Sequence, residues 1–403
     1  MDGLRSISFD LDEGDAATAP LVDLAGADGY LFTRERRGIA AWGRAARFQL
    51  DEAVPRLSSI PHEDRSSGCA GPLALGSVAF LPDEPAELVV PAVVIRDDGS
   101  GRRTVTVTDN EPAETSPDIP VHRPPQPFAA AFEVSPDSDI DRYLLAVERA
   151  ADAVRAGEMD KAVIARTVRV RSDAEIPVHS VLRRLESMFS STYRFSIDGL
   201  IGASPELLVE VEGDTVRANP LAGTTRTTGD PDRDRALAED LLRSEKNQIE
   251  HRAAIEMVRD TLLPHCSYLD WTPEPSIVRV ANVQHLGSLA EGHLSSPRAT
   301  VTELVRALQP TPAVGGHPRD AALALIAEVE DFERGRYGGA VGWVDGNGDG
   351  TWAVTLRCAE LSEDRREARL VAGGGIVADS VARDELAETQ AKLQAMLSAI
   401  VRA

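Results

Sequence analysis

Hydrophobic and polar positions along the chain predict two portions of different character. In residues 1–110, short alternating or β-branched runs such as ISFDL, GYLFT and RRTVTVTD are separated by Gly, Pro and Asp turns, which predicts strands. A proline-rich stretch over residues 111–128 predicts an extended connection. We therefore expect a β-rich N-terminal portion, 1–127, and a region, 128–403, that carries the chemistry.

The second portion mixes helical and strand periodicity. Residues 140–156 and 178–188 show the apolar spacing of amphipathic helices, and residues 161–172 alternate as a strand that begins at Lys161. We also expect one long, largely buried helix over 236–263. In residues 276–288 we expect a single strand that enters a loop, with His285 at its end. This mixture predicts an α/β protein.

Three consecutive glycines, Gly373, Gly374 and Gly375, follow a strand-like run and precede a charged helix. Since glycine amides can turn toward a ligand, we expect a backbone-donor loop here. The helix places Glu385, Glu388 and Lys392 on one face, where they could hold a metal-bound anion. The alternative is a surface turn followed by an i,i+4 Glu–Lys pair.

Lysine usage favours the first of these alternatives. The chain has 43 lysines and arginines, but its only lysines are Lys161, Lys246 and Lys392. An amine can lose its proton and act as a base, whereas a guanidinium cannot. We therefore treat the three lysines as markers of one site, although drift toward arginine-rich codons would also explain their scarcity.

Charge and cysteine content exclude several classes of protein. A formal net charge of −22 argues against non-specific binding to nucleic acid or to an anionic membrane. The three cysteines are widely spaced and give neither a disulfide framework nor a zinc pattern. No signal peptide or membrane-spanning run is evident, so a cytoplasmic protein is expected.

Several single residues are candidates for chemistry. Glu206 stands alone between apolar runs in IGASPELLVEV, where burial would raise its pKa and suit it to donate a proton, although a solvated glutamate at a strand end is the alternative. The expected long helix carries a polar cluster of Lys246, Asn247, Glu250 and His251. A buried acid there must be paired, protonated or metal-bound, and the alternative is a helix salt bridge from Lys246 to Glu250. Arg357 in an apolar strand would need a carboxylate partner, which the substrate could supply.

Taken together and in order, the motifs resemble those of the chorismate-utilising enzymes, the family of isochorismate, salicylate, anthranilate and aminodeoxychorismate synthases. The resemblance extends from about residue 140 to the C-terminus and rests on ten blocks: DKAVIAR, GASPELLV, PLAGTTR, SEKNQIEHR, VQHLGS, PTPAVGGHPR, YGGAVGW, TLRCAEL, GGGIVADS and ELAETQAKL. It implies a single large α/β (α+β) chorismate-binding fold of the anthranilate and aminodeoxychorismate synthase type, with two facing antiparallel sheets flanked by helices. On this view the proline-rich stretch is an internal connection.

The resemblance also implies a set of site residues. Mg²⁺ would be held by Glu250 and Glu388, with Glu385 and Asn247 holding its water ligands. Lys161 and Glu206 would be the catalytic base and acid. The implied substrate-binding residues are Thr224, His285, Tyr337, Arg357, Lys392 and the glycines Gly373, Gly374 and Gly375.

Within the family, the motifs are most similar to those of the isochorismate synthases. Lys161 favours water as the nucleophile, and PTPAVGG differs from the PxxTxSGxP form of the lyase-active and anthranilate-type members. One departure is Gln309, where isochorismate synthases usually have histidine; we expect a structural replacement. No glutamine amidotransferase partner is expected.

We therefore predict Mg²⁺-dependent isomerisation of chorismate to isochorismate, by attack of water at C2 and loss of the C4 hydroxyl. The nearest alternative is a salicylate synthase, which would also eliminate pyruvate. A different class of protein, a non-catalytic anion-binding member of the fold, is the third hypothesis. The sequence does not decide whether the product enters menaquinone, catechol siderophore or salicylate synthesis.

Overall fold

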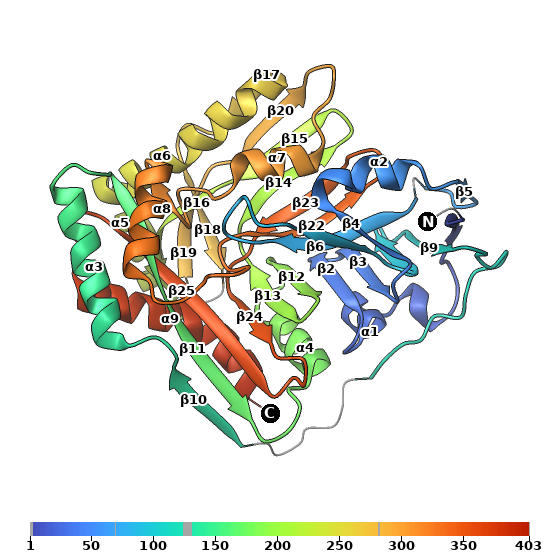
Figure 1. The fold of residues 1–403 in the computed structure, drawn as a ribbon, viewed down its shortest axis with the longest axis horizontal. Coiled ribbons are helices and arrows are strands. Elements are labelled where there is room, and N and C mark those ends of the chain that lie inside the picture. The colour runs from blue at the N-terminus through green and yellow to red at the C-terminus, as the bar shows by residue number, and fades with distance from the viewer. Residues whose placement is uncertain (1–2, 69, 124–130, 281–282, 403) are drawn as a thin grey trace.

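The computed structural model describes residues 3–68, 70–123, 131–280 and 283–402, apart from the side chain of Lys246. Within these residues the largest sheet has thirteen strands (Figure 1). Their order is β10 (Phe132–Pro136), β11 (Lys161–Ser172), β25 (Glu367–Ile376), β24 (Cys358–Leu361), β13 (Leu200–Ser204), β12 (Tyr193–Ile197), β2 (Tyr30–Arg34), β3 (Arg37–Trp42), β8 (Val93–Asp97), β9 (Arg103–Asp109), β1 (Arg5–Asp10) and β5 (His62–Asp64), with β21 (Gly316–His317) pairing β11.

Two further sheets are formed by the described residues. The nine-stranded sheet runs β17 (Cys266–Trp271), β20 (Ala290–Leu294), β15 (Thr215–Asn219), β14 (Leu207–Glu212), β23 (Gly350–Val354), β22 (Ala340–Asp345), β6 (Leu73–Val78), β7 (Glu87–Val90) and β4 (Ala46–Gln49). The small sheet runs β16 (Leu221–Arg226), β19 (Val283–Gly287) and β18 (Ser276–Val280). The expected pair of antiparallel sheets is therefore present, with a third small sheet added and one parallel pairing, β1 with β5.

The two large sheets face each other across a shared core. Phe32 and Phe195 of the first sheet and Leu75 and Trp343 of the second belong to one cluster of buried side chains. Alternate residues of a strand point to opposite faces of the sheet, so one set of side chains fills this space and the other meets the helices outside. The mixed α/β architecture predicted from the sequence is confirmed.

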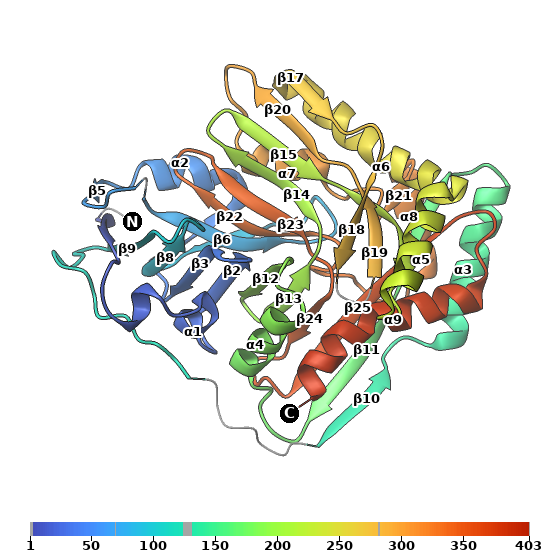
Figure 2. The same cartoon turned by 180° about the vertical axis from the view of Figure 1, so that it is seen from behind.

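Helices cover the outer faces of the sheets (Figures 1 and 2). Those against the thirteen-stranded sheet pack on β3, β11, β12, β13 and β25: α1 (Leu21–Ala25), α3 (Ile140–Arg155), α4 (Val178–Met188), α8 (Arg319–Val329) and α9 (Ala382–Val401). The others pack on the nine-stranded and small sheets: α2 (Ala53–Ser58), α5 (Pro231–Arg243), α6 (Glu245–Leu262) and α7 (Val301–Leu308). Among the helices of the described residues, none is both long enough and apolar enough to cross a bilayer.

Strands from the N-terminal portion belong to the same sheets as strands from the rest of the chain. β2 pairs with β12, and β6 pairs with β22, so hydrogen-bonded ladders run across the expected division. The boundary itself, between residues 127 and 128, lies outside the described residues.

Two predicted elements are wrong. The long helix over 236–263 is broken at Ser244, whose side chain accepts a hydrogen bond from the Asn247 amide and so caps a new helix, α6. The expected burial is also wrong in part, because Ile249 of α6 is 59% exposed. The single strand over 276–288 is two antiparallel strands, β18 and β19, that pair with each other.

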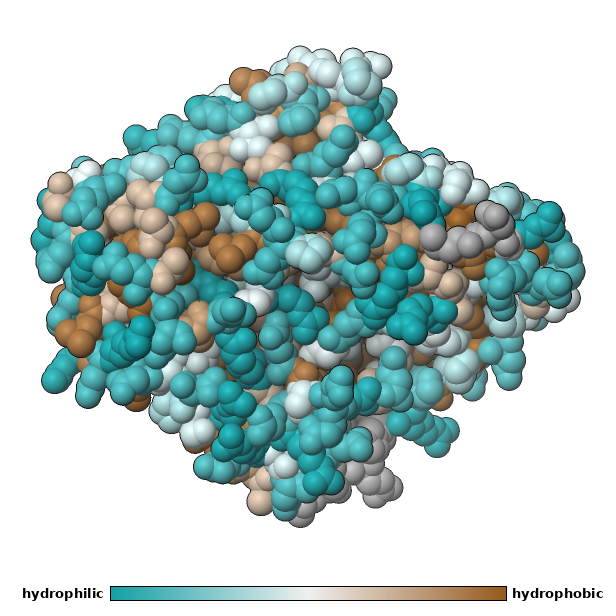
Figure 3. Space-filling view, viewed as in Figure 1, coloured by the Kyte–Doolittle hydropathy of each residue, from teal (hydrophilic) through white to brown (hydrophobic). Residues whose placement is uncertain are grey.

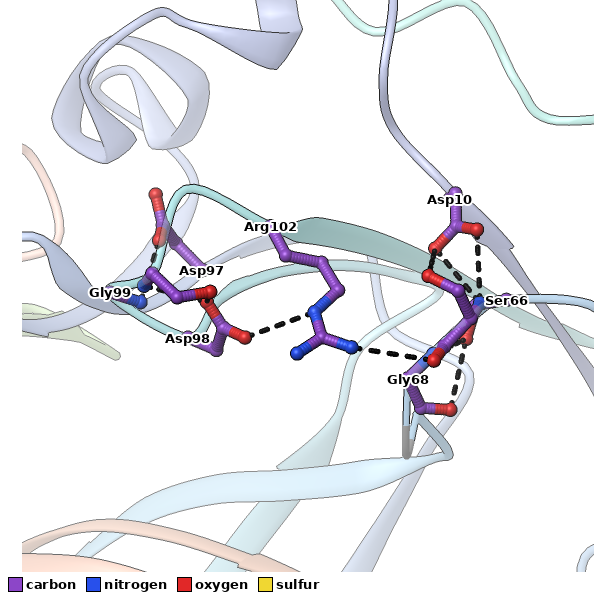
Figure 4. A network of polar contacts seen from close by, with 9 residues as sticks. Asp10, Ser66, Gly68, Asp97, Asp98, Gly99 and Arg102 are labelled. Carbon is purple, nitrogen blue, oxygen red and sulfur yellow. Dashed lines mark hydrogen bonds and ion pairs between the residues drawn. The ribbon is translucent and has the colours of Figure 1, made fainter.

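Polar contacts connect the loop between β8 and β9 with the ends of β1 and β5 (Figure 4). Arg102 donates to Asp98 and to the carbonyl oxygen of Ser67, while Asp10 accepts from the Ser67 amide. On the face drawn in Figure 3, hydrophilic side chains predominate and hydrophobic ones form small groups, in keeping with the acidic composition.

Candidate active site

A cavity of about 230 Å³ brings together residues from six strands and helices and from the loops between them. Thirteen of the fourteen predicted site residues line it: Lys161, Glu206, Thr224, Asn247, Glu250, His285, Tyr337, Arg357, Gly373, Gly375, Glu385, Glu388 and Lys392. The remaining one, Gly374, lies in the same strand as Gly373. Lys161 and Lys392 thus share one site, as lysine usage predicted, whereas the side chain of Lys246 is outside the described part of the structure.

Lys161 forms a buried ion pair with Glu250. It begins β11, and its Nζ lies 2.6 Å from Glu250 Oε1, with side-chain exposures of 9% and 16%. Burial by itself would raise the pKa of Glu250, but the charge of Lys161 and its hydrogen bond outweigh burial, and the net pKa is lowered. Glu250 is therefore ionised. The partner of the Lys161 amine in this structure is thus a carboxylate.

Glu206 is a buried acid with an unsatisfied oxygen. It follows Ser204 and Pro205 between β13 and β14 and is 2% exposed. Its Oε1 has no hydrogen-bond partner in the described part of the chain. Burial raises the pKa of Glu206 to about 8, although a backbone hydrogen bond from Leu221 and the charge of Lys161 act in the opposite direction. The carboxyl group therefore retains its proton at neutral pH.

The small sheet contributes two neutral polar groups. Thr224 on β16 is paired with His285 on β19, and Thr224 Oγ1 lies 3.0 Å from His285 Nδ1. Burial, assisted by the charges of Arg357 and Lys392, lowers the pKa of His285 to about 3, so the imidazole is uncharged. Its Nε2 is buried and, among the described residues, has no partner.

Two basic residues, Arg357 and Lys392, also line the cavity. Arg357 lies at the break between β23 and β24 with φ of 49°, a conformation that costs free energy for a non-glycine residue. Burial lowers its pKa to about 10, which still leaves it charged at neutral pH. Lys392 Nζ donates to the Gly373 carbonyl at 2.8 Å and pairs with Glu388 Oε1 at 2.6 Å.

The glycine triplet is not the loop that we predicted. Gly373, Gly374 and Gly375 lie inside β25, paired with Ala165, Ile164 and Val163 of β11. The Gly373 amide donates to Tyr337 Oη at 2.8 Å and so does not face a ligand. Burial raises the pKa of Tyr337 to about 12, which keeps its hydroxyl protonated.

These glycines instead leave space for the polar side chains of the site. A Cβ atom on Gly375 would lie 2.5 Å from Lys161 Cε, and one on Gly374 would lie 2.8 Å from Glu385 Oε2. The backbone remains in the sheet because β11 satisfies its hydrogen bonds, a constraint that the local sequence does not reveal.

Gly375→Ala is expected to displace Lys161, and with it the Glu250 pair, while leaving the fold intact. The expected result is a fall in kcat of at least about tenfold, since small displacements of a reacting group are costly. Steady-state kinetics and the melting temperature would be measured together. Gly71→Ala is the matched control, because its Cβ would meet His62 only at an ordinary 3.8 Å. Equal activity of the two variants would contradict the idea that Gly375 leaves space needed for the placement of Lys161.

The residues proposed for a metal are oxygen donors. Carboxylate and amide oxygens of Glu250, Glu388, Glu385 and Asn247 line the cavity, and these are ligands that suit Mg²⁺. Glu250 and Glu388 are now paired with lysines. Within the described residues no group of three acidic, histidine or cysteine side chains is already arranged around a common point. The donor set fits the ion, provided that these carboxylates exchange their lysine partners.

Ser380 is a supporting residue that sequence analysis missed. Its hydroxyl donates to Glu385 Oε1 at 2.8 Å and accepts from the Val377 amide. The available signal was its position in the block GGGIVADS, five residues before Glu385. Gln309, noted as a departure from the isochorismate synthase pattern, follows α7, is 1% exposed and does not line the cavity.

The buried Glu206 is expected to make the stability of the fold depend on pH. Its pKa rises from 4.5 to about 8 on folding, so it contributes stability that is complete below about pH 4.5 and is lost as pH rises through about 8. Wild type should therefore lose stability relative to Glu206→Gln over this range, by at most about 1.4 kcal/mol per pH unit. Melting temperatures of both proteins near pH 5 and pH 8 test this. A difference that does not change with pH would contradict it.

The chain is similar to several known proteins. The family model of chorismate binding enzymes matches residues 60–401. The MenF protein of Mycobacterium tuberculosis is 40% identical over 347 residues, which cover 83% of this chain and 87% of that protein. The isochorismate synthase DhbC of Bacillus subtilis is 36% identical over 363 residues, covering 87% and 86%.

The fold is also similar to that of a solved structure. That of MenF, the menaquinone-specific isochorismate synthase from Escherichia coli, matches with a TM-score of 0.84 and 25% identity over 99% of this chain and 95% of that one. The resemblance inferred from the ten motif blocks is confirmed, and the chain belongs to the family of chorismate-binding enzymes.

Proposed function

We propose that this protein is an isochorismate synthase, which converts chorismate to isochorismate. The observation that carries the proposal is the meeting of a buried, protonated Glu206 and an amine, Lys161, in one cavity that also holds Arg357 and Lys392. An allylic displacement of hydroxyl by water needs an acid at the leaving oxygen and a base at the attacking one. The relatives named isochorismate synthases support the same reaction.

The proposed reaction balances with these two groups. Lys161 takes a proton from water as the water oxygen bonds to C2. Both conjugated ring double bonds then shift, C1=C2 to C1=C6 and C5=C6 to C4=C5, and the C4–O bond breaks. Glu206 gives its proton to the departing hydroxyl, which leaves as water. An acid and a base that work together in this way need different pKa values, and the environment of each group sets that difference.

The remaining polar residues would orient the substrate. Arg357 and Lys392 are suited to its two carboxylates, since a guanidinium can bind a carboxylate through two parallel hydrogen bonds. His285 is uncharged, and its Nε2 has no partner among the described residues, so it is suited to bind a hydroxyl group together with Thr224. Tyr337 and Gly373 would form the wall against which the ring lies.

Magnesium is part of this proposal. Glu250 and Glu388 would hold the ion directly, and Glu385 and Asn247 would hold its water ligands. When bound, Mg²⁺ would neutralise the ring carboxylate and orient the ring. The pair between Lys161 and Glu250 stabilises an ammonium, so Lys161 is better suited to act as a base when Glu250 is engaged elsewhere.

Incubation of the protein with chorismate and Mg²⁺ tests the reaction. We expect isochorismate and no pyruvate. Salicylate together with pyruvate would instead show a salicylate synthase. Binding of chorismate in a calorimeter without any product would indicate a non-catalytic member of the fold.

Glu388→Gln is expected to weaken Mg²⁺ binding by at least about tenfold, because an amide supplies no charge to a divalent cation. Calorimetric titration with MgCl₂ alone gives a readout that does not depend on turnover. Asp384→Asn is the matched control, since it removes one exposed carboxylate from the first turn of the same helix, α9. If both variants bind Mg²⁺ as wild type does, Glu388 is not a ligand.

Other features of the proposal rest on the sequence. A cytoplasmic location, and the absence of a nucleic-acid, membrane or amidotransferase partner, stay predictions. The pathway that uses the product also stays open among menaquinone, catechol siderophore and salicylate synthesis.

A further inference from the structure

The end of β11 that carries Lys161 has an incomplete outer edge. On that side, β21 pairs with Lys161 and Ala162, and the Val163 amide donates to Gly315 O. β10 pairs only from Val168 onward. In the described part of the chain, neither neighbouring strand reaches Ala165, although this stretch is buried. A buried edge left without partners would be costly.

Two side chains satisfy this edge in place of a strand. Arg334 Nη2 donates to the Val163 carbonyl at 2.6 Å, and Glu330 Oε1 accepts from the Ala165 amide at 2.8 Å. They thus present one donor and one acceptor to alternate residues of β11, as a neighbouring strand does.

The same two residues are locked to each other. Arg334 binds both oxygens of Glu330, at 2.5 and 2.8 Å, and both side chains are 3% exposed. The guanidinium lies 4.3 Å from the centre of the Phe80 ring, and its Nη1 donates to the Val314 carbonyl at 2.8 Å. Arg334 therefore joins β11 to the loop that contains Ala313, which lines the cavity.

A buried ion pair is a weak source of net stability, because the cost of removing two charges from water offsets most of their attraction. What this pair provides is geometry: a planar guanidinium held by two bonds and an aromatic ring has little freedom to move. The strand segment that it holds, Val163 to Ala165, begins two residues after Lys161.

We infer that Glu330 and Arg334 are positioning residues that act as a substitute strand for β11 and thereby fix the placement of Lys161 in the cavity. Neither residue lines the cavity. The kinetic part of this inference rests on the proposed function; the structural part does not.

Amide hydrogen exchange tests the structural part without substrate. In Glu330→Ala and Arg334→Lys, exchange over residues 162–167 should be about ten- to a hundredfold faster than in wild type, because buried strand amides exchange only by local opening. Glu330→Gln keeps an acceptor oxygen for Ala165 and should restore much of the protection. Unchanged exchange in the alanine variant would overturn the inference.

Kinetics test the placement of Lys161. We expect Arg334→Lys and Glu330→Ala to lower kcat by about ten- to a hundredfold with little change in KM, and Glu330→Gln to recover most of it. The matched control is Arg103→Lys. Arg103 is also buried, pairs with Asp97 at 2.8 Å and donates to the Ala16 and Ala19 carbonyls, but none of these residues lines the cavity.

The outcomes separate the explanations. If Arg334→Lys, like Arg103→Lys, lowers only the melting temperature, the pair is merely structural and the inference fails. If amide exchange over residues 162–167 becomes faster in the variants but wild type does not convert chorismate, the structural role of Glu330 and Arg334 is supported. Only the proposed function then fails.

Discussion

Replacing Glu206 with glutamine is expected to lower kcat by about 10²- to 10⁴-fold, the usual contribution of a general acid. Glutamine has almost the same shape but no proton to give to the departing hydroxyl. Because of this similar shape, and because one oxygen of Glu206 has no partner in the described part of the chain, the substitution should leave the fold intact. Steady-state kinetics with chorismate would measure the loss.

The pH profile distinguishes an acid from a binding group. Burial raises the pKa of Glu206 to about 8, so the reactive, protonated form dominates below that pH and is lost above it. Wild-type kcat should therefore fall as pH rises through about 8, and the small residual rate of Glu206→Gln should lack this fall. Glu212→Gln, at the exposed end of β14, is the matched control and should behave as wild type. A normal rate in Glu206→Gln would exclude Glu206 as the acid.

Lys161→Arg is expected to fold normally and to lose kcat by a similar factor, about 10²- to 10⁴-fold. Arginine keeps the positive charge and can still pair with Glu250, but it does not release its proton and so cannot accept one from water. The melting temperature should stay near that of wild type while activity is lost. Retention of more than about a tenth of the activity would remove Lys161 from the role of base.

Lys161→Met separates chemistry from stability at the same position. It removes the partner of a carboxylate that is only 16% exposed, and an unpaired buried charge typically costs about 3–5 kcal/mol. A large drop in melting temperature is therefore expected for methionine and not for arginine. If both variants are equally stable, the pair with Glu250 does not contribute as the structure suggests.

Local elements were predicted well where periodicity is strong. The helix expected over 140–156 is α3, Ile140–Arg155, with Asp139 accepting a hydrogen bond from the Arg142 amide as its cap. The strand expected over 161–172 is β11, and the helix expected over 178–188 is α4. In these segments the apolar spacing matches one face of one element, so local and tertiary preferences agree.

Prediction failed where a distant strand or a side-chain cap decides the conformation. Gly373–Gly375 would suit a loop, yet they continue β25 because β11 pairs with them. Ser244 interrupts a continuous helical pattern, because its side chain can cap α6 and replace one intrahelical bond. Arg357 sits at a turn with positive φ inside a run that alternates like one strand.

The family, the mixed α/β class and the polar side chains of the cavity could be inferred from the sequence, because the ten motif blocks and the scarce lysines are visible without coordinates. Only the tertiary structure decided which of those residues touch. Lys161 and Glu250 are 89 residues apart in sequence and 2.6 Å apart in space, and Glu330 and Arg334 complete an edge of a strand far from them in the chain. Such contacts depend on how whole sheets and helices pack, and no local pattern encodes that packing.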